Sequence, residues 1–325
     1  MNQEIPYSGL FKDFTPEPVK LPLPRLNGHI PPTIEEKAAA PMHVDEPAAP
    51  AELVSANQFT VEELTDAYNE TRLDYMVPMP MNAARLQEYI NLYQIDLSNS
   101  LVVIDEGKKV GLGMLGVRPG RSWITRLGLV ASTRGKGIGS LLMNGLVGNS
   151  EKLGLEKTIL EVIKGNEPAH KMFKKFGFEE QRELLILRRA PAEVPKPTSE
   201  VSWLELDECL HLLKSRQGMI AWTNQTESLE HAKGVTGFKV TTQDGKTGWL
   251  VFQRTLFNLS RLMFDTQDKS ADTMRELLYH LHSHYPTVDT YTENIPADDP
   301  HLQAMLDVGY LEAFSRIEMH RPYKG

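Results

Sequence analysis

The loop from Arg134 to Gly139 contains the residues whose types and spacing most clearly suggest chemistry. Glycine occurs at Gly135, Gly137 and Gly139, with Lys136 between the first two. Because glycine has no Cβ, successive backbone N–H groups of this loop can approach one ligand without side-chain interference. Apolar residues at helical spacing follow the loop, and the positive end of a helix dipole favours an anion. The loop therefore predicts a cradle for a pyrophosphate group.

Two common ligand types of a glycine loop do not fit this chain. The order of the glycines differs from the Gly-x-Gly-x-x-Gly of a dinucleotide-binding unit, and no acidic residue ends the next strand to bind a ribose. The Gly-Lys-Ser/Thr ending of a nucleoside triphosphatase is also missing. A structural turn without a ligand remains the alternative at this point.

Two motifs together resemble the GNAT superfamily of N-acetyltransferases. Arg134, Gly137 and Gly139 match its signature Gln/Arg-x-x-Gly-x-Gly/Ala, and residues 160–178 resemble its second coenzyme motif. The resemblance covers roughly residues 55–189. It implies an α/β fold with a mixed α+β sheet, the acyl-CoA N-acyltransferase fold, and acetyl-CoA as the co-substrate of an N-acetyltransferase.

The resemblance also implies roles for individual positions. Backbone groups of Leu127, Gly128 and Leu129 would pair with the pantetheine arm, where two parallel strands splay apart. The pyrophosphate-binding amides would be those of Arg134, Gly135, Lys136, Gly137, Ile138 and Gly139. Asn166 and Phe173 would contact the coenzyme from the following helix. The acceptor amine would attack the thioester directly, without a covalent enzyme intermediate, and a strand N–H would stabilise the oxyanion.

The residues that move protons are harder to identify. Many members of the superfamily have a tyrosine where this chain has Phe173, which has no proton to give the departing thiolate. A coenzyme thiol resembles cysteine, whose pKa is about 8.5, so an acid is helpful rather than obligatory. The strand predicted at 123–130 carries no carboxylate. The candidates for a general base are Glu161, Asp74 and Tyr75, with water through a relay as an alternative.

Each acidic candidate also has a structural interpretation. Glu161 lies on an otherwise apolar strand and is expected to be a buried, hydrogen-bonded carboxylate if it has no catalytic role. Asp74 is then a solvated loop charge. The loop of residues 73–81 around it is rich in methionine and proline, and the resemblance places it beside the acceptor pocket, with core packing as the alternative.

Regular elements are predicted around the glycine loop. A capping box of Thr60 and Glu63 opens a helix near 60–70, and apolar spacing predicts a second helix near 82–94. Strands are predicted at 101–104, 110–117, 123–130 and 159–163, with one helix after the glycine loop and another ended by Gly177. The order α-α-β-β-β-α-β-α-β predicts a mixed sheet rather than a doubly wound one.

The C-terminal third weakly repeats this pattern. The matching segments are Ser260–Phe264 with Thr125–Leu129, Asn294 with Asn166, and Gly309 with Gly177. The positions that match Arg134, Gly135, Gly137 and Gly139 are Lys269, Ser270, Asp272 and Met274. Side chains and carboxylates there would repel a pyrophosphate, so this degenerate copy is expected to support the first or to wall its acceptor cleft. Tandem arrangements occur in the superfamily, and the outline is similar to that of mycothiol synthase.

Proline-rich stretches divide the chain. Residues 1–52 contain ten of the 21 prolines and are predicted to be a disordered extension, with a strand or arm that docks on the body as the alternative. Residues 53–189 form the predicted catalytic N-acetyltransferase domain, and 190–200 form a linker. Residues 201–325 form the degenerate acetyltransferase-like domain.

Composition argues against several classes of partner. The net charge of −8 disfavours nucleic acid and anionic membranes. One cysteine excludes an intramolecular disulfide and a cysteine-rich zinc site. Neither a membrane span nor a signal peptide is evident, so a cytoplasmic location is expected. The partner is expected to be a small-molecule or peptide amine; the rival hypothesis is an acetyl-CoA-binding sensor or scaffold without turnover, and transfer of a longer acyl group is a third.

Three histidines and several large residues invite further interpretation. Of His280, His282 and His284 only the first and last share a helix face, and no third ligand is evident, so no metal is expected. The side chains expected to pack in the core are Trp203, Trp222, Trp249 and Cys209.

Overall fold

The structure is a computed structural model that describes residues 50–77, 79–230 and 232–323. Residues 1–49 of the predicted N-terminal extension are outside the described ranges. Pro78, in the methionine-rich loop, is outside them as well. The chain from Ala48 onward is one compact unit. None of the helices in the described ranges is long and apolar enough to cross a membrane.

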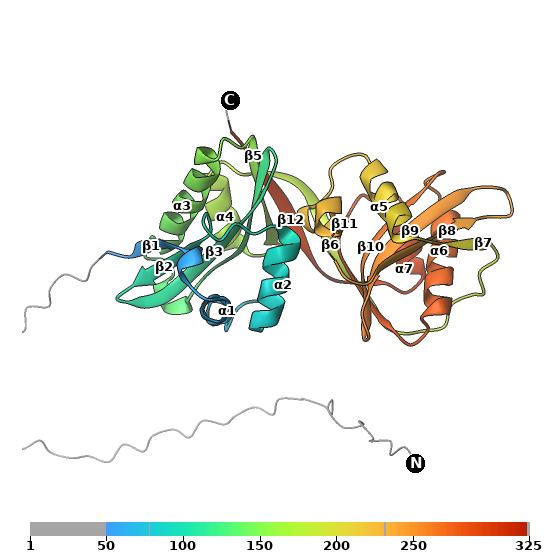
Figure 1. Cartoon of the computed structure of the whole chain (residues 1–325), viewed down its shortest axis with the longest axis horizontal. Coiled ribbons are helices and arrows are strands. Elements are labelled where there is room, and N and C mark those ends of the chain that lie inside the picture. The colour runs from blue at the N-terminus through green and yellow to red at the C-terminus, as the bar shows by residue number, and fades with distance from the viewer. Residues whose placement is uncertain (1–49, 78, 231, 324–325) are drawn as a thin grey trace, which may run out of the picture. The chain divides into compact units, whose positions relative to one another are not determined.

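Twelve strands of the described chain form one mixed sheet (Figure 1). They are β1 (Glu52–Ser55), β2 (Leu101–Asp105), β3 (Lys108–Arg118), β4 (Arg121–Leu129), β5 (Lys157–Ile163), β6 (Glu179–Arg189), β7 (Glu200–Leu204), β8 (Val235–Thr241), β9 (Thr247–Arg254), β10 (Asn258–Thr266), β11 (Asp289–Pro296) and β12 (Leu311–Pro322). The α-helices are α1 (Val61–Glu70), α2 (Ala83–Tyr93), α3 (Ile138–Lys152), α4 (Glu167–Lys175), α5 (Leu206–Ser215), α6 (Ala271–His284) and α7 (Leu302–Asp307). Strands β4 and β5 pair in parallel, as do β10 and β11, and the other pairs are antiparallel, so the predicted mixed sheet is confirmed.

The elements predicted between residues 60 and 178 are present to within about two residues. Helix α1 begins with the predicted capping box, in which the Thr60 hydroxyl accepts from the Glu63 N–H at 3.2 Å and the Glu63 carboxylate accepts from the Thr60 N–H at 2.9 Å. Strand β1 was not predicted, because four residues are too few to show a period.

Helices cover both faces of the first half of the sheet. Helices α3 and α4 pack on one face, in the cluster that contains Ile124 and Leu160. Helices α1 and α2 pack on the other face, in the cluster that contains Trp123 and Ile159. Because side chains alternate along a strand, Glu161 points to the same face as Ile159, toward α1 and α2.

The first half opens where β4 and β5 part. These strands pair from Arg121 opposite Lys157 up to Ile124 opposite Leu160, and no pairing follows. The separation coincides with a register shift between β3 and β4 and with Arg126, whose φ is 51°. A bulge of this kind bends a strand and re-aims its side chains.

The second half repeats this arrangement. Strands β10 and β11 pair in parallel only up to Ser260, and Arg261, with φ 53°, has the same left-handed backbone as Arg126. Gly309 and Gly177 both have positive φ after a short helix. The predicted repeat is therefore confirmed at these two points.

Two details of the predicted alignment are wrong. Asn294 lies within strand β11, at a register shift, and not at the start of a helix as Asn166 does. The loop before α6 is also two residues shorter than the sequence repeat predicted. The residue that caps α6 is Ser270 and the one that caps α3 is Gly137, so these two correspond.

The two halves exchange their last strands. Strand β12 lies between β5 and β6, and β6 lies between β12 and β11. The last strand of each half thus pairs with the preceding strand of the other half, through antiparallel ladders on both sides. Neither half has a complete sheet without the other.

A buried arginine reinforces the junction between the halves. Arg118 donates to the Trp222 carbonyl at 3.0 Å, to Gln225 at 2.7 Å and to Ser228 at 2.7 Å, and its guanidinium stacks over the Trp222 ring at 4.1 Å. Trp222 in turn stacks on Trp123 with the ring centroids 5.7 Å apart. Trp222 and Cys209 are fully buried as predicted, whereas Trp203 is 42% exposed on edge strand β7, so that prediction was wrong.

Candidate functional site

A cleft of about 1020 Å³ opens where β4 and β5 part. The residues predicted for coenzyme binding line it, apart from Lys136 and Ile138, and so do the three candidates for a general base. The second half contributes Thr223, Glu293 and Arg316 to the same cleft. Residues of both halves therefore form one site.

The glycine loop has the geometry of an anion cradle. Gly135 and Gly137 have φ of 78° and 84°, a conformation that side-chain-bearing residues avoid. The amides of Gly135, Lys136 and Gly137 donate to no acceptor in the described part of the chain. Gly137 also caps the 15-residue helix α3. Free amides and a helix N-terminus thus converge on an exposed loop.

Arg134 is directed toward Asp74 instead of the cradle. Its two terminal nitrogens lie 2.6 and 2.8 Å from the Asp74 carboxylate, and the guanidinium also donates to the Leu129 carbonyl at 2.9 Å. The hydrogen bond from Arg134 holds the pKa of Asp74 below its usual range. Both side chains are nearly half exposed.

The β4 edge that faces the cleft is held by a second arginine. Arg72 donates to the Leu127 carbonyl at 2.9 Å and stacks over the Tyr75 ring at 4.2 Å. Gly128 allows β4 to approach α1, because a Cβ at this position would come 2.6 Å from the Thr71 hydroxyl. The segment after α1 therefore packs directly on the predicted pantetheine-binding strand.

Glu161 lies in a buried cluster of charges. Its carboxylate is 3.3 Å from the Asn294 side-chain amide and 3.4 Å from the Arg316 guanidinium. Arg316 also donates to Glu293 at 2.8 Å. Burial raises the pKa of Glu161 to about 7, and the neighbouring carboxylates Glu318 and Glu293 act in the same direction. Glu161 is thus the hydrogen-bonded buried carboxylate of the structural interpretation, and it also lines the cleft, as a catalytic role would require.

Glu293 behaves differently from Glu161. Although burial opposes ionisation, the charge and hydrogen bond of Arg316 hold the pKa of Glu293 below its usual range. The cluster therefore contains one carboxylate that stays ionised and one that can exchange a proton near neutral pH.

The two predicted coenzyme contacts on α4 have distinct environments. Asn166 caps the helix by accepting from the Ala169 N–H at 3.4 Å. Phe173 is 5% exposed, packs against Phe178 with the ring centroids 6.2 Å apart, and also lines the cleft. Lys171 and Lys175 of the same helix also line the cleft.

Several cleft residues could not be recognised in the sequence. Glu293 and Arg316 reach the site only through the strand exchange, which leaves no local signal. Tyr89 fitted the apolar spacing of α2 and was expected only to support that helix. Arg126 stands next to the predicted pantetheine-binding segment, and its left-handed backbone has no sequence signature in a residue other than glycine.

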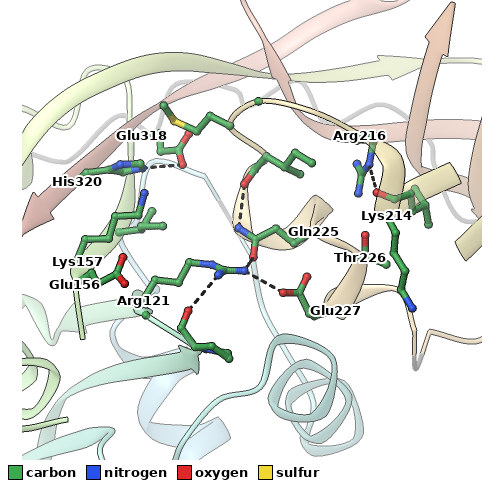
Figure 2. Close-up of a pocket in the computed structure, with 17 residues that line it drawn as sticks. Arg121, Glu156, Lys157, Lys214, Arg216, Gln225, Thr226, Glu227, Glu318 and His320 are labelled. Carbon is green, nitrogen blue, oxygen red and sulfur yellow. Dashed lines mark hydrogen bonds and ion pairs between the residues drawn. The ribbon is translucent and has the colours of Figure 1, made fainter. Parts of the chain in front are cut away.

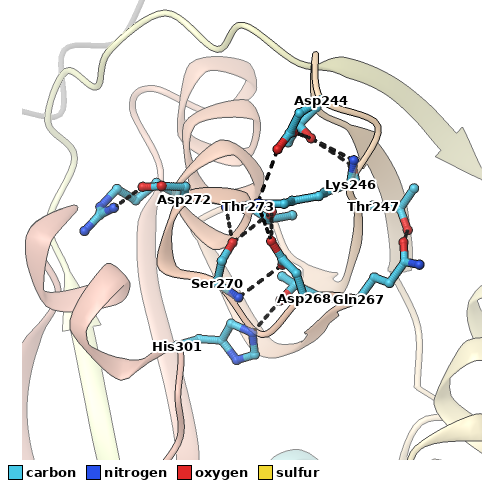
Figure 3. Close-up of polar contacts among 12 residues, drawn as sticks. Asp244, Lys246, Thr247, Gln267, Asp268, Ser270, Asp272, Thr273 and His301 are labelled. Carbon is cyan, nitrogen blue, oxygen red and sulfur yellow. Dashed lines mark hydrogen bonds and ion pairs between the residues drawn. The ribbon is translucent and has the colours of Figure 1, made fainter.

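The corresponding loop of the second half is filled by its own acid (Figure 3). Asp268 accepts from the Ser270 N–H at 3.1 Å and from the Thr273 hydroxyl at 3.3 Å, and it pairs with Lys246 at 3.3 Å. Although desolvation opposes ionisation of Asp268, hydrogen bonds from Ser270 lower the pKa of this carboxyl group. A carboxylate therefore already occupies the Ser270 amide at the start of α6.

A second, polar cavity of about 440 Å³ lies at the junction of the halves (Figure 2). Most of its charges are already paired. Arg121 donates to Gln225 at 2.8 Å and to Glu227 at 2.9 Å, and the Glu318 carboxylate lies 3.1 Å from the His320 ring. Within the described ranges no three His, Cys, Asp or Glu side chains are grouped to hold a metal ion.

Comparison with known proteins identifies the family of the first half. Residues 60–178 match the model of the acetyltransferase (GNAT) family. No curated protein sequence matches the chain.

Solved structures resemble nearly the whole described chain. A GCN5-related N-acetyltransferase from Sphaerobacter thermophilus aligns over 84% of this chain and 95% of its own, with TM-score 0.61 and 10% identity. A tandem GNAT protein from the clavulanic acid biosynthesis pathway aligns over 85% and 99%, with TM-score 0.58 and 14% identity. A GCN5-related N-acetyltransferase from Kribbella flavida aligns over 84% and 71%, with TM-score 0.53 and 16% identity. At these identities the comparison establishes the fold, a tandem arrangement included.

Proposed function

Because residues 60–178 belong to the acetyltransferase (GNAT) family, we propose that this chain is an N-acetyltransferase. It moves an acetyl group from acetyl-CoA to the primary amine of a small metabolite or peptide. The observation that carries the proposal is the cleft itself, where two parallel strands part beside a loop of unbonded amides. This arrangement offers an extended arm a strand edge and offers a pyrophosphate a helix N-terminus.

The coenzyme is held mainly by backbone groups in this proposal. The amides of Gly135, Lys136 and Gly137 bind the pyrophosphate, and the β4 edge beyond Ile124 pairs with pantetheine. Lys171 and Lys175 add positive charge at the cleft wall, which explains how an acidic chain binds an anionic co-substrate.

Glu161 is the general base that the geometry favours. An alkyl ammonium group has a pKa near 10 and must lose a proton before it attacks the thioester. A base with a pKa of about 7 is half ionised at neutral pH and still takes up a proton readily. Arg316 and Asn294 keep its carboxylate in one place within the cleft.

Asp74 and Tyr75 fit the role of base less well. Asp74 is a weaker base because its pair with Arg134 lowers its pKa, and the aromatic ring of Tyr75 packs under Arg72. We assign both to the wall of the coenzyme and acceptor cleft. The thiolate leaves without a tyrosine at position 173, as its modest basicity allows.

The second half supports the site without binding coenzyme. The Ser270 amide and the Thr273 hydroxyl of its loop donate to Asp268, an internal anion that a pyrophosphate would have to displace. Its contribution is instead Glu293, Thr223 and Arg316 in the acceptor part of the cleft.

The test follows free thiol while the protein is incubated with acetyl-CoA and a library of amines. Thiol release that depends on one class of amine is the expected result, and calorimetry with coenzyme A reports binding separately. Tight coenzyme binding with no thiol release for any amine would favour the sensor or scaffold. Comparison of acetyl-CoA with longer acyl thioesters decides which acyl group is transferred.

A further inference from the structure

Arg126 is placed at the parting of the strands, one residue before the predicted pantetheine-binding segment. Its guanidinium lies over the Tyr89 ring at 4.2 Å and 5.3 Å from the Tyr68 ring centroid. One terminal nitrogen, Nη1, donates to the Tyr68 hydroxyl at 3.2 Å. Because Tyr68 and Tyr89 belong to α1 and α2, this arginine lies on the face of the sheet to which Glu161 points.

No carboxylate of the described cleft residues contacts this guanidinium, and the charge of Glu293 acts on it only from a distance. No carboxylate of the described residues lies within 4.0 Å of Arg126, and its Nε is buried without a hydrogen-bond acceptor. Arg134 and Arg316, which also line the cleft, are paired with Asp74 and Glu293. Arg72, the remaining cleft arginine of the described residues, has no carboxylate partner either, but its terminal nitrogen donates to the Leu127 carbonyl. A cation that has lost part of its hydration without gaining a contacting counter-ion favours the binding of an anion in the cleft.

The free atoms have the geometry of a carboxylate site. With Nη1 bonded to Tyr68, the remaining Nε and Nη2 form the side-on fork of the guanidinium. Two parallel N–H groups of this kind match the two oxygens of a planar carboxylate. A phosphate group is usually bound by several hydrogen-bond donors at once. Such donors are the free amides of the glycine loop, which precedes α3 on the opposite face of the sheet from Arg126.

We propose that the acceptor is an amino-carboxylate, whose carboxylate binds Arg126 while its amine faces Glu161. The assignment of the amine rests on the proposed transferase function, whereas the carboxylate site depends on Arg126 alone. The acceptor then enters along the α1–α2 face, with its side chain against Tyr89, Tyr93, Met76 and Met79. Trp123 Nε1, which is buried without an acceptor, offers one further donor in the same part of the cleft.

The experiment measures binding and transfer separately. Calorimetry of the full chain with coenzyme A present compares the common L-amino acids and simple dipeptides with their carboxamides. At least one acid is expected to bind about 10- to 100-fold more tightly than its amide, which is the range of a charge-assisted pair. Arg126→Gln should remove the difference between acid and amide, and Arg126→Lys should keep part of it.

A matched control removes an arginine that also stacks on a tyrosine. Arg254 lies over Tyr285 at 5.1 Å, outside the cleft, and Arg254→Gln should keep the full preference for the acid. The proposal is overturned if no acid binds better than its amide, or if Arg126→Gln retains the preference. Acid binding without thiol release would leave the carboxylate site in place and contradict the transferase function instead.

Discussion

Glu161 on β5 lies directly opposite Glu318 on β12 in the antiparallel ladder between the two strands. Like charges in such positions repel each other. Glu318 is fixed as an anion by Arg182 at 2.6 Å and by its hydrogen bond with His320. Although burial opposes ionisation of Glu318, the hydrogen bond with His320 and the charge of Arg182 hold the pKa of Glu318 below its usual range. The strand from the second half therefore helps to keep Glu161 protonatable near neutral pH.

The first prediction concerns the pH dependence of transfer. Since Glu161 acts as a base only when ionised, kcat/KM should fall below a pH of about 7. Glu161→Gln should lower kcat/KM by about 100-fold or more and remove this acidic limb. The measurement is thiol release from pH 5.5 to 8.5, with Glu179→Gln, an exposed strand glutamate, as the control. An unchanged limb in Glu161→Gln would assign the titration to another group.

The same residue gives a prediction for stability. Its pKa is higher in the folded chain than in the unfolded one, so raising the pH above the unfolded value, about 4.3, destabilises the fold up to a pH of about 7. Glu161→Gln removes this cost. The difference in Tm between the Glu161→Gln variant and the parent protein should be more favourable to the variant at pH 8 than at pH 4. At pH 4 the side chain at position 161 is neutral in both proteins. Equal shifts at the two pH values would contradict the raised pKa.

A further prediction tests the glycine cradle with a matched pair. Gly137 and Gly245 are both exposed, have φ of 84° and 82°, and have no atom within 4 Å of an added Cβ. Aspartate imposes the same backbone strain at either position. Gly137→Asp should abolish coenzyme A binding in calorimetry, whereas Gly245→Asp should bind normally. Equal coenzyme affinity in the two folded variants would rule out the cradle.

Removal of Asp74 should strengthen coenzyme binding. Asp74→Asn takes a negative charge away from the loop and releases Arg134 from its ion pair. The pair is nearly half exposed, so the expected gain in coenzyme A affinity is roughly 2- to 5-fold and should shrink at high salt. Asp66→Asn, on the exposed side of α1, is the control. A loss of affinity would mean that the pair with Asp74 holds the loop in its binding conformation.

The strand exchange predicts one cooperative unfolding transition for residues of both halves. Leu142 packs in the core under α3 and Leu277 in the core of the second half, and both are fully buried. Each substitution by alanine should cost about 2–5 kcal/mol and shift the whole transition. Scanning calorimetry measures this. Two separate transitions, with only one shifted by each variant, would show that the halves unfold independently.

What could be predicted from the sequence depended on local signals. The capping box at Thr60, the glycines of the loop and the alternation in β5 each act within a few residues, so their elements were found. The functional charge cluster could not be found in this way. Arg316 and Glu293 become neighbours of Glu161 through pairing between strands far apart in the chain, and no spacing rule encodes that.

The repeat shows the same limit on a smaller scale. Arg126 and Arg261 aligned correctly because the strands that carry them kept their length. After these arginines, the loop that leads to α6 is two residues shorter than the loop that leads to α3. An alignment with a constant offset therefore matched Asp272 to Gly137, whereas the N-cap positions of the two helices match Ser270 to Gly137. The carboxylate that bonds this loop is Asp268, and that the second loop repels phosphate stays a prediction.

The exchanged strands also bear on how the chain is made. Strand β6 ends at Arg189, and its neighbour β12 begins only at Leu311. While the ribosome is still adding the second half, β5 lacks a partner on one edge and β6 on both, and such edges favour contacts between nascent chains. Arg316 is the last of the described cleft residues to be synthesised, so a chain whose synthesis stops early contains the glycine loop but an incomplete cleft.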